Sequence, residues 1–178
     1  SSATGGATFC FTTDGVTTPV CDAVTATCTT GTTYTAALSV PADQTITAIA
    51  CVAGMINSPV SSAAYVIDTT APVISGVSPA SSAYVTSTQV SYTLSENCAT
   101  GSVSWAQTGG SPDPGSPRVQ ALVGAELSAG TKTNITLTNN PALVDGATYS
   151  VKFDCTDAAG NAATPVTMTG VTYDAAAP

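Results

Sequence analysis

The feature that most constrains the fold of this chain is the alternation of apolar side chains with threonine and serine. Val90, Tyr92 and Leu94 are separated by single hydroxyl residues, and so are Val103 and Trp105. Because successive side chains of a strand point to opposite faces, each segment presents one apolar face to a core. Valine, threonine, tyrosine, isoleucine, phenylalanine and tryptophan make up 66 of the 178 residues, a composition that favours strands. The sequence therefore predicts an all-β fold.

The charges and the missing histidine exclude several classes of function. The chain has 11 acidic and 3 basic residues, a net charge of −8 and no histidine. We expect no nucleic acid partner and no membrane insertion, because only Arg118, Lys132 and Lys152 could meet phosphates and no apolar run is long enough to span a bilayer. Histidine relays and histidine-ligated metals are excluded. Glu96 and Glu126, the only glutamates, lie in no context that forms a cleft, so we expect no enzyme and no catalytic residue.

A repeated segment divides the chain. Asp68-Thr69-Thr70-Ala71-Pro72 recurs in weaker form as Asp174-Ala175-Ala176-Ala177-Pro178, each time after a strand that contains tyrosine. Proline ends strand pairing, so both segments are typical of linkers. We expect one domain over residues 1–68, a second over residues 69–178, and a natural polypeptide that continues beyond Pro178.

Residues 69–178 have the length of one immunoglobulin-like sandwich and contain seven strand signals. The predicted strands are residues 73–77, 89–95, 102–107, 119–123, 134–138, 148–154 and 166–173. Residues 109–117 contain three prolines and three glycines, which predicts a mobile loop that is neither strand nor helix.

Three motifs in this half resemble immunoglobulin-like proteins. The segment from Leu143 to Tyr149 resembles the tyrosine corner of fibronectin type III and related sandwiches, and residues 157–161 (DAAGN) resemble bacterial immunoglobulin-like repeats. The first resemblance implies that Tyr149 is structural. Cys98, Trp105 and Cys155 follow the cysteine, tryptophan, cysteine order of immunoglobulin domains, which implies a Cys98–Cys155 disulfide. Trp105 alternates with Val103 and should point into the core.

The first half resembles a different family. Residues 7–15 (ATFCFTTDG) are similar to the ATIYYTTDG signature of the domain at the C-terminus of chitobiases and β-hexosaminidases, and residues 34–40, 45–50 and 61–67 follow that family's later strands in order. The resemblance implies a small non-catalytic β-sandwich on secreted or cell-surface proteins. Relatives have about two further strands before this signature, so it also implies an incomplete sandwich. Residues outside 1–178, or a strand from a neighbouring copy, would complete it.

The six cysteines contain no CxxC pair and predict disulfides in an oxidising, extracellular compartment. The resemblance makes Cys10 and Cys51 neighbours, which leaves Cys21 to pair with Cys28. A free thiol pair among these four residues is the alternative.

Oxygen-bearing side chains gather at one pole of the predicted second sandwich and suggest calcium as the one cofactor of this chain. The candidate ligands are Asp68, Glu96, Asp154, Asp157 and Asn161. The alternative is that residues 157–161 form only a hairpin turn, in which Asp157 accepts backbone hydrogen bonds and Gly160 adopts a positive φ. Separately, Asn134-Ile135-Thr136 fits an N-glycosylation acceptor.

These observations predict a non-enzymatic extracellular structural protein. It would be a building block of a surface stalk, adhesin or filament, made of tandem immunoglobulin-like domains with β-strand complementation. Its partners would be further copies of itself in a polymer, or neighbouring domains of a longer chain. The alternative is an accessory spacer or carbohydrate-binding module of a secreted glycoside hydrolase.

Overall fold

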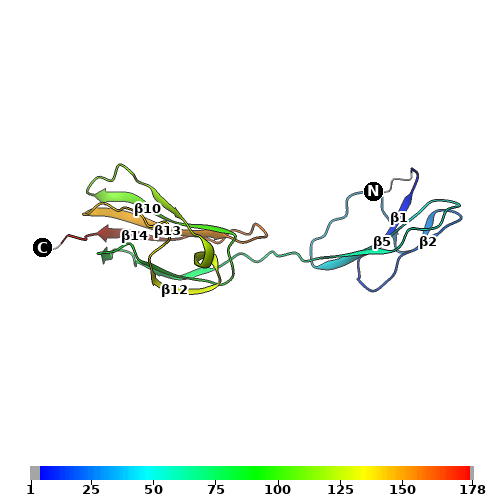
Figure 1. The fold of residues 1–178 in the computed structure, drawn as a ribbon, viewed down its shortest axis with the longest axis horizontal. Helices are drawn as coiled ribbons and strands as arrows, with labels where there is room; N and C mark the ends of the chain where they lie inside the picture. The colour runs from blue at the N-terminus through cyan, green and yellow to red at the C-terminus, as the bar shows by residue number, and fades with distance from the viewer. Residues whose placement is uncertain (1–4, 177–178) are drawn as a thin grey trace. The chain divides into compact units, whose positions relative to one another are not determined.

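The structure, a computed structural model, describes residues 5–176 (Figure 1). The regular elements of the described residues are strands and one short 3-10 turn, so the fold is all-β as predicted. The chain divides into two compact units, Ser1–Asp68 and Thr69–Pro178. None of the described segments is a helix with the length and hydrophobicity needed to cross a bilayer.

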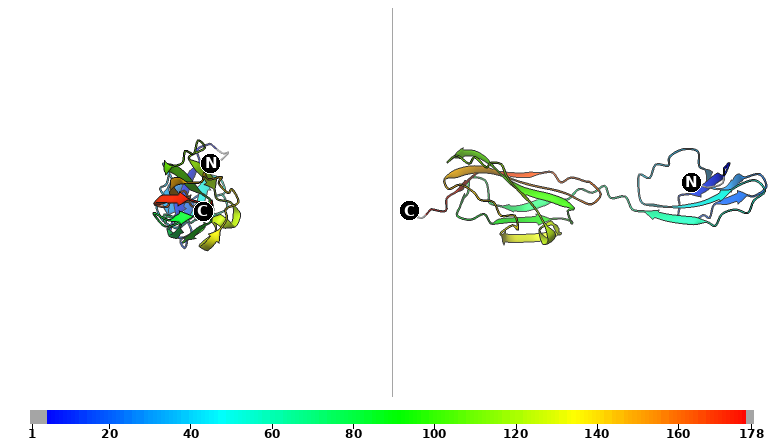
Figure 2. Two further views of the ribbon diagram at one scale, coloured as in Figure 1. Left: turned by 90° about the vertical axis from the view of Figure 1, so that its left-hand side faces the viewer. Right: turned by 45° about the horizontal axis from the view of Figure 1, so that its top comes forward.

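The second unit is a sandwich of two sheets, visible as two layers in Figure 2. The larger sheet has the order β11-β10-β13-β14-β8 and the smaller sheet the order β12-β9-β7. The elements are β7 (Ile74–Ser78), β8 (Tyr84–Val85), β9 (Val90–Leu94), β10 (Thr100–Gly110), β11 (Arg118–Ala121), the 3-10 turn η1 (Gly124–Leu127), β12 (Gly130–Ile135), β13 (Ala147–Thr156) and β14 (Val166–Tyr173). Among the named strands of residues 5–176, β8 and β14 are the only pair that runs parallel.

The core of this unit consists of alternate side chains from β9, β10 and β13, as the alternation predicts. Each of these side chains is at most 2% exposed: Val90, Tyr92, Leu94, Val103, Trp105, Tyr149, Val151 and Phe153. The Trp105 and Tyr149 rings meet edge to face, with centroids 6.0 Å apart. Period-two patterning therefore identifies both the strands and the buried face of each.

One predicted strand is displaced. The sequence places it at residues 134–138, whereas β12 ends at Ile135. Asn134 has φ of +47° at a bulge in the pairing of β12 with β9, and the backbone N–H of Thr138 donates to the Glu126 carboxylate at 2.6 Å. Leu137 is buried as its apolar character suggests, but the chain has already left the sheet there.

The first unit combines one sheet with one hairpin. Its strands are β1 (Thr8–Thr12), β2 (Val20–Asp22), β3 (Thr27–Thr30), β4 (Thr32–Thr33), β5 (Gln44–Cys51) and β6 (Ser61–Tyr65). The sheet has the order β4-β1-β5-β6, and β2 pairs with β3. Cys10, Cys21 and Cys51 form its buried cluster, with Cys28 and Ile49 packed against them. Its core is therefore built largely of cysteine.

All six cysteines form disulfides, which pair Cys98 with Cys155, Cys10 with Cys28, and Cys21 with Cys51. The first pair is the expected one. The expected pairings Cys10–Cys51 and Cys21–Cys28 are wrong. Cys21 and Cys28 are direct neighbours within the β2–β3 hairpin, and Cys10 and Cys51 lie on one face of the β1–β5 pair. The hairpin covers that face, so each disulfide joins one layer to the other rather than two neighbours within a layer.

Candidate functional site

The sheet of the first unit carries an apolar groove on the face opposite the cysteines. Phe9 and Phe11 flank Cys10 in β1 and therefore point to the other face. The groove has a volume of about 600 Å³. Seven residues line it: Phe9, Phe11, Tyr34, Leu38, Ile46, Ala48 and Tyr65. Tyr34 and Tyr65 are 49% and 45% exposed, and none of the lining residues is charged. The face therefore resembles one inner side of a sandwich without its second layer.

Strand β6 forms an unprotected edge of the same sheet. It pairs with β5 on one side and has no strand partner on its outer side among residues 5–176. All five of its residues (SSAAY) are exposed. Soluble proteins block pairing at a sheet edge with lysine, proline or a β-bulge. Strand β6 contains neither lysine nor proline, and its pairing with β5 has no bulge. The edge is therefore open to an added strand.

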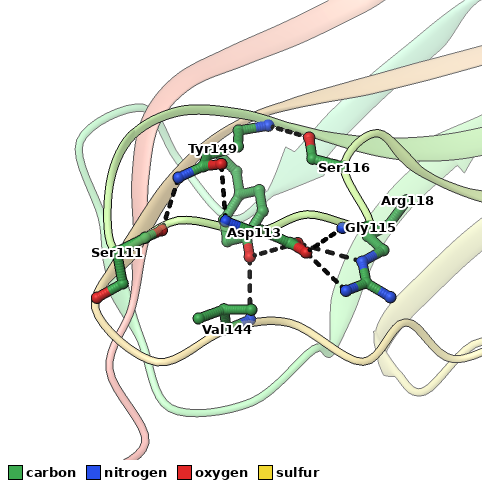
Figure 3. Close-up of polar contacts among 8 residues, drawn as sticks. Ser111, Asp113, Gly115, Ser116, Arg118, Val144 and Tyr149 are labelled. Carbon is green, nitrogen blue, oxygen red and sulfur yellow. Dashed lines mark hydrogen bonds and ion pairs between the residues drawn. The ribbon is translucent and has the colours of Figure 1, made fainter.

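In the second unit, the loop predicted to be mobile is held in place by side chains (Figure 3). Gly109 and Gly110 belong to β10, so the prediction that residues 109–117 contain no strand is wrong. Gln107 donates to the Ser111 carbonyl at 2.6 Å and accepts from the backbone N–H of Asp113 at 2.9 Å. The glutamine side chain thus fastens a segment that glycine and proline alone would leave unrestrained.

Asp113 is the centre of this network, and the sequence analysis missed it. Its carboxylate accepts from Arg118 at 2.6 and 3.1 Å, from the Gly115 N–H at 2.9 Å and from the Tyr149 hydroxyl at 3.0 Å. The Arg118 hydrogen bonds are the main reason why its pKa falls to about 2. An acid five residues before an arginine, in a loop rich in glycine and proline, was the available signal.

Tyr149 completes the corner that its motif implies. Its hydroxyl accepts the Val144 N–H at 3.0 Å while it donates to Asp113. The phenol thereby ties the segment before β13 to the 109–117 loop. Tyr149 is fully buried, so its role is structural.

The proposed calcium ligands are only partly brought together. Carboxylate oxygens of Glu96 and Asp157 lie within 4.8 Å of each other. Asp154 instead pairs with Lys152 at 2.9 Å and accepts from the Ser102 hydroxyl at 2.8 Å. Asp68 is the last residue of the first unit.

Residues 157–161 have the geometry of the alternative, a hairpin turn. Asp157 accepts from the backbone and the side chain of Asn161, both at 2.8 Å, and Gly160 has φ of +95°. Burial alone would raise the pKa of Asp157, but the Asn161 hydrogen bonds lower it. The carboxylate is thus stabilised in its charged form by the turn itself.

Asn134, in the candidate glycosylation motif, is an exposed residue at the β12 bulge. Its side-chain oxygen accepts from the Ser91 hydroxyl at 3.2 Å, and its backbone N–H donates to the same hydroxyl at 2.9 Å. Modification of Asn134 remains a prediction.

Sequence comparison agrees with the architecture of the second unit. A family model described as a bacterial Ig-like domain matches residues 68–173. The chain belongs to this family. Comparison with curated proteins gave no match. A bacterial Ig-like domain suggests a non-enzymatic domain at the cell surface or outside the cell, and three disulfides fit an oxidising environment.

The buried carboxylates of the Ig-like domain fit a structural role. Besides Asp113 and Asp157, Glu126 is buried, and it accepts from the Val123 N–H and from the N–H and hydroxyl of Thr138. Burial would raise the pKa of Glu126, but these hydrogen bonds lower it. Each of these acids therefore fastens a turn or loop of the Ig-like domain.

Proposed function

We propose that this chain is a non-enzymatic building block of an extracellular stalk, adhesin or filament, in which the first unit is completed by a β-strand from a neighbouring copy or domain. The observation that carries the proposal is the open edge of β6. The apolar groove on one face of the same sheet, which no second layer covers among the described residues, supports the same proposal.

Strand addition at β6 follows from the chemistry of its backbone. An edge strand presents a row of N–H and C=O groups that an extended segment can pair with, which is a common mode of peptide recognition. The side chains of β6 are small except for Tyr65, so a neighbouring strand can approach without a steric or electrostatic obstacle. Main-chain hydrogen bonds would provide affinity there without demanding a particular sequence.

The composition suits a durable extracellular module. Three basic residues leave few sites for trypsin-like proteases, and three disulfides tie layers together. The net charge of −8 limits non-specific aggregation, because copies of the chain repel each other. Association would therefore be confined to surfaces that carry no charge.

Electron microscopy of the purified chain, with sedimentation velocity over a range of concentrations, tests the proposal. We expect regular assemblies from the unmodified chain and their loss in Ala64→Lys, because a lysine on β6 blocks edge pairing. Val119→Lys is the matched control, since Val119 is 62% exposed on β11, an edge of the Ig-like domain. Equal assembly of Ala64→Lys and the unmodified chain, or dispersed monomers of both, would contradict the proposal.

The aromatic rings of the groove favour a second candidate, a carbohydrate-binding accessory module of a secreted glycoside hydrolase. Phe9, Phe11, Tyr34 and Tyr65 all line the groove, and sugars stack on such rings. Retardation of the chain by a neutral polysaccharide in native gels, abolished by a Tyr34→Ala, Tyr65→Ala double substitution, would support this alternative. Unchanged mobility would exclude it for the polysaccharide used.

A further inference from the structure

We propose that the four cysteines of the first unit, in their reduced form, bind one zinc ion between the β2–β3 hairpin and the sheet. The ligands are Cys10, Cys21, Cys28 and Cys51, called the thiolate site below. The site lies on a face of the sheet and not on its β6 edge, so the proposal goes beyond strand addition and does not depend on it.

The thiolate site takes two ligands from each of two layers. Cys21 and Cys28 are direct partners in the pairing of β2 with β3. In the pairing of β1 with β5, Cys10 lies opposite Ile49, two residues from Cys51, so Cys10 and Cys51 are diagonal neighbours on one face. The hairpin and the sheet therefore present two pairs of cysteines to each other. Closely spaced cysteines of common zinc motifs are brought together along the chain, whereas here strand pairing brings them together.

The sulfur atoms already lie at about the spacing that a zinc ion needs. Cys10 Sγ and Cys21 Sγ are 3.5 Å apart, and the Sγ atoms of Cys10, Cys21 and Cys51 all lie within 4.8 Å of one another. With Zn–S bonds of about 2.3 Å, the sulfurs of a tetrahedral site are about 3.8 Å apart. Cys28 is bonded to Cys10 and belongs to the same group of sulfurs. Zinc binding therefore calls for adjustment of the four side chains and not of the strands.

The surroundings of the thiolate site favour a soft cation that is shielded from water. Cys10, Cys21 and Cys51 are buried, and Ile49 packs against them. Cys28 is half-buried and provides a path by which an ion can enter. Thiolate sulfur selects zinc over calcium and magnesium, which take oxygen ligands. The chemistry of the site is therefore distinct from that of the carboxylates considered for calcium.

The charge of the first unit also favours a bound cation. Residues 1–68 contain four aspartates and no lysine, arginine or histidine. Without a positive group nearby, buried thiols of this unit stay protonated, because burial and negative charges both disfavour the thiolate. A divalent cation supplies the missing positive charge and deprotonates the thiols that it binds. The ion and the four thiolates therefore form together.

Zinc and disulfides are alternative links between the same two layers. In a chain kept under reducing conditions, the zinc ion takes the place of the Cys10–Cys28 and Cys21–Cys51 disulfides. A low-molecular-weight disulfide, such as oxidised glutathione, converts the zinc form into the disulfide form by thiol–disulfide exchange. Two molecules of it accept four electrons and become four thiolates, the four cysteines form two disulfides, and the ion leaves as Zn²⁺. The layers of the first unit therefore stay linked under both conditions.

Titration of the reduced full chain with Co²⁺ alone tests the thiolate site. Cobalt substitutes for zinc, and tetrahedral sulfur ligation gives Co²⁺ an intense visible absorption that aqueous Co²⁺ lacks. The chain is reduced with a phosphine in the absence of oxygen and freed of other metals. We expect the absorption to reach its maximum at one Co²⁺ per chain, and one equivalent of Zn²⁺ to remove it.

Two variants assign the ion to these cysteines. Cys28→Ser should weaken binding of Co²⁺ at least about tenfold, because loss of even a supporting contact costs that much at a metal site. The matched control is the Cys98→Ala, Cys155→Ala double substitution, which removes the other two cysteines of the chain and keeps the thiolate site. It should bind Co²⁺ like the unmodified chain. Absence of the absorption in the unmodified chain, its loss in the control, or undiminished affinity of Cys28→Ser overturns the proposal.

Hydrogen exchange distinguishes a folded site from the thiols of an unfolded chain. In the reduced chain, β1 and β5 should exchange rapidly with a chelator present and become protected when Zn²⁺ is added, because metal binding stabilises the fold that assembles the ligands. Protection that is the same with Zn²⁺ and with the chelator overturns the proposal, even if metal binds. Strand addition is unaffected by that outcome, since Ala64→Lys tests it in the disulfide-bonded chain.

Discussion

Asp113 shows how one side chain can order a loop that its composition would leave free. Its pKa of about 2, lowered chiefly by hydrogen bonds from Arg118, compares with about 3.9 in an unfolded chain. A lowered pKa in the folded state means that the ionised group stabilises the fold above about pH 4, and that this stabilisation is lost as the pH falls through about 2.

We therefore expect Asp113→Asn to be less stable than the unmodified chain at pH 7, and the difference to narrow as the pH falls below 4. Denaturant unfolding followed by the fluorescence of Trp105, the only tryptophan, measures this at several pH values. A difference that stays constant with pH would show that the charge of Asp113 is not what stabilises the loop.

Tyr149 makes two buried hydrogen bonds that a phenylalanine cannot make. In Tyr149→Phe the Val144 N–H loses its acceptor and Asp113 loses a donor, while the ring packing against Trp105 is retained. We expect a loss of about 1–3 kcal/mol in unfolding free energy. Tyr84→Phe, at a tyrosine that is 78% exposed, should change little. Equal stability of Tyr149→Phe and the unmodified chain would mean that the corner is held by packing alone.

Calcium can be tested at Asp157. Because Asn161 engages both carboxylate oxygens of Asp157, and Lys152 and Ser102 engage Asp154, we expect added calcium to leave the melting temperature unchanged. A ligand at 100 times its dissociation constant would add about 2.7 kcal/mol to stability. A rise in melting temperature with calcium, abolished in Asp157→Asn but not in Asp174→Asn, would establish the site instead.

At the scale of strands and hairpins, the alternation of side chains predicts which segments are strands and which face of each is buried. It does not predict how one layer packs on another. The buried faces of β9, β10 and β13 follow directly from alternation. The two-residue strand β8 has no period to detect, since it exists through its pairing with Thr172 and Tyr173 of β14. The cysteine partners of the first unit could not be predicted either, because they depend on which face the β2–β3 hairpin covers. The groove could not be predicted because alternation marks Phe9 and Phe11 as one face but not whether a layer covers it.

Two disulfides are the main links between the β2–β3 hairpin of the first unit and its sheet. We therefore expect this unit to be sensitive to reduction. Its buried cluster comprises Cys10, Cys21 and Cys51, and chain entropy assigns each disulfide there about 3–4 kcal/mol. We expect a reducing agent to unfold residues 1–68 while the Ig-like domain, with its larger apolar core, stays folded. Hydrogen exchange read by mass spectrometry distinguishes the two halves. Continued protection of β1 and β5 after complete reduction would contradict the expectation.

For the whole molecule, the two units have separate cores, one of mostly apolar side chains and one of cysteines. A polypeptide built in this way should unfold in two steps, because ordering one core does little to order the other. The linker between them contains Thr69, Thr70 and Ala71 and ends at Pro72, and such a segment carries no large side chain for either core.

We therefore expect calorimetry of the full chain to resolve two transitions that respond to different substitutions. A Cys98→Ala, Cys155→Ala double substitution removes the bridge of the Ig-like domain, whose loop predicts a loss of about 4 kcal/mol. Only the transition reported by Trp105 fluorescence should move to lower temperature, because Trp105 packs in the same core as that disulfide. The transition of the first unit, followed by hydrogen exchange at β1 and β5, should stay where it is. If both transitions moved together, the units would be thermodynamically coupled and could not serve as independent beads along a stalk.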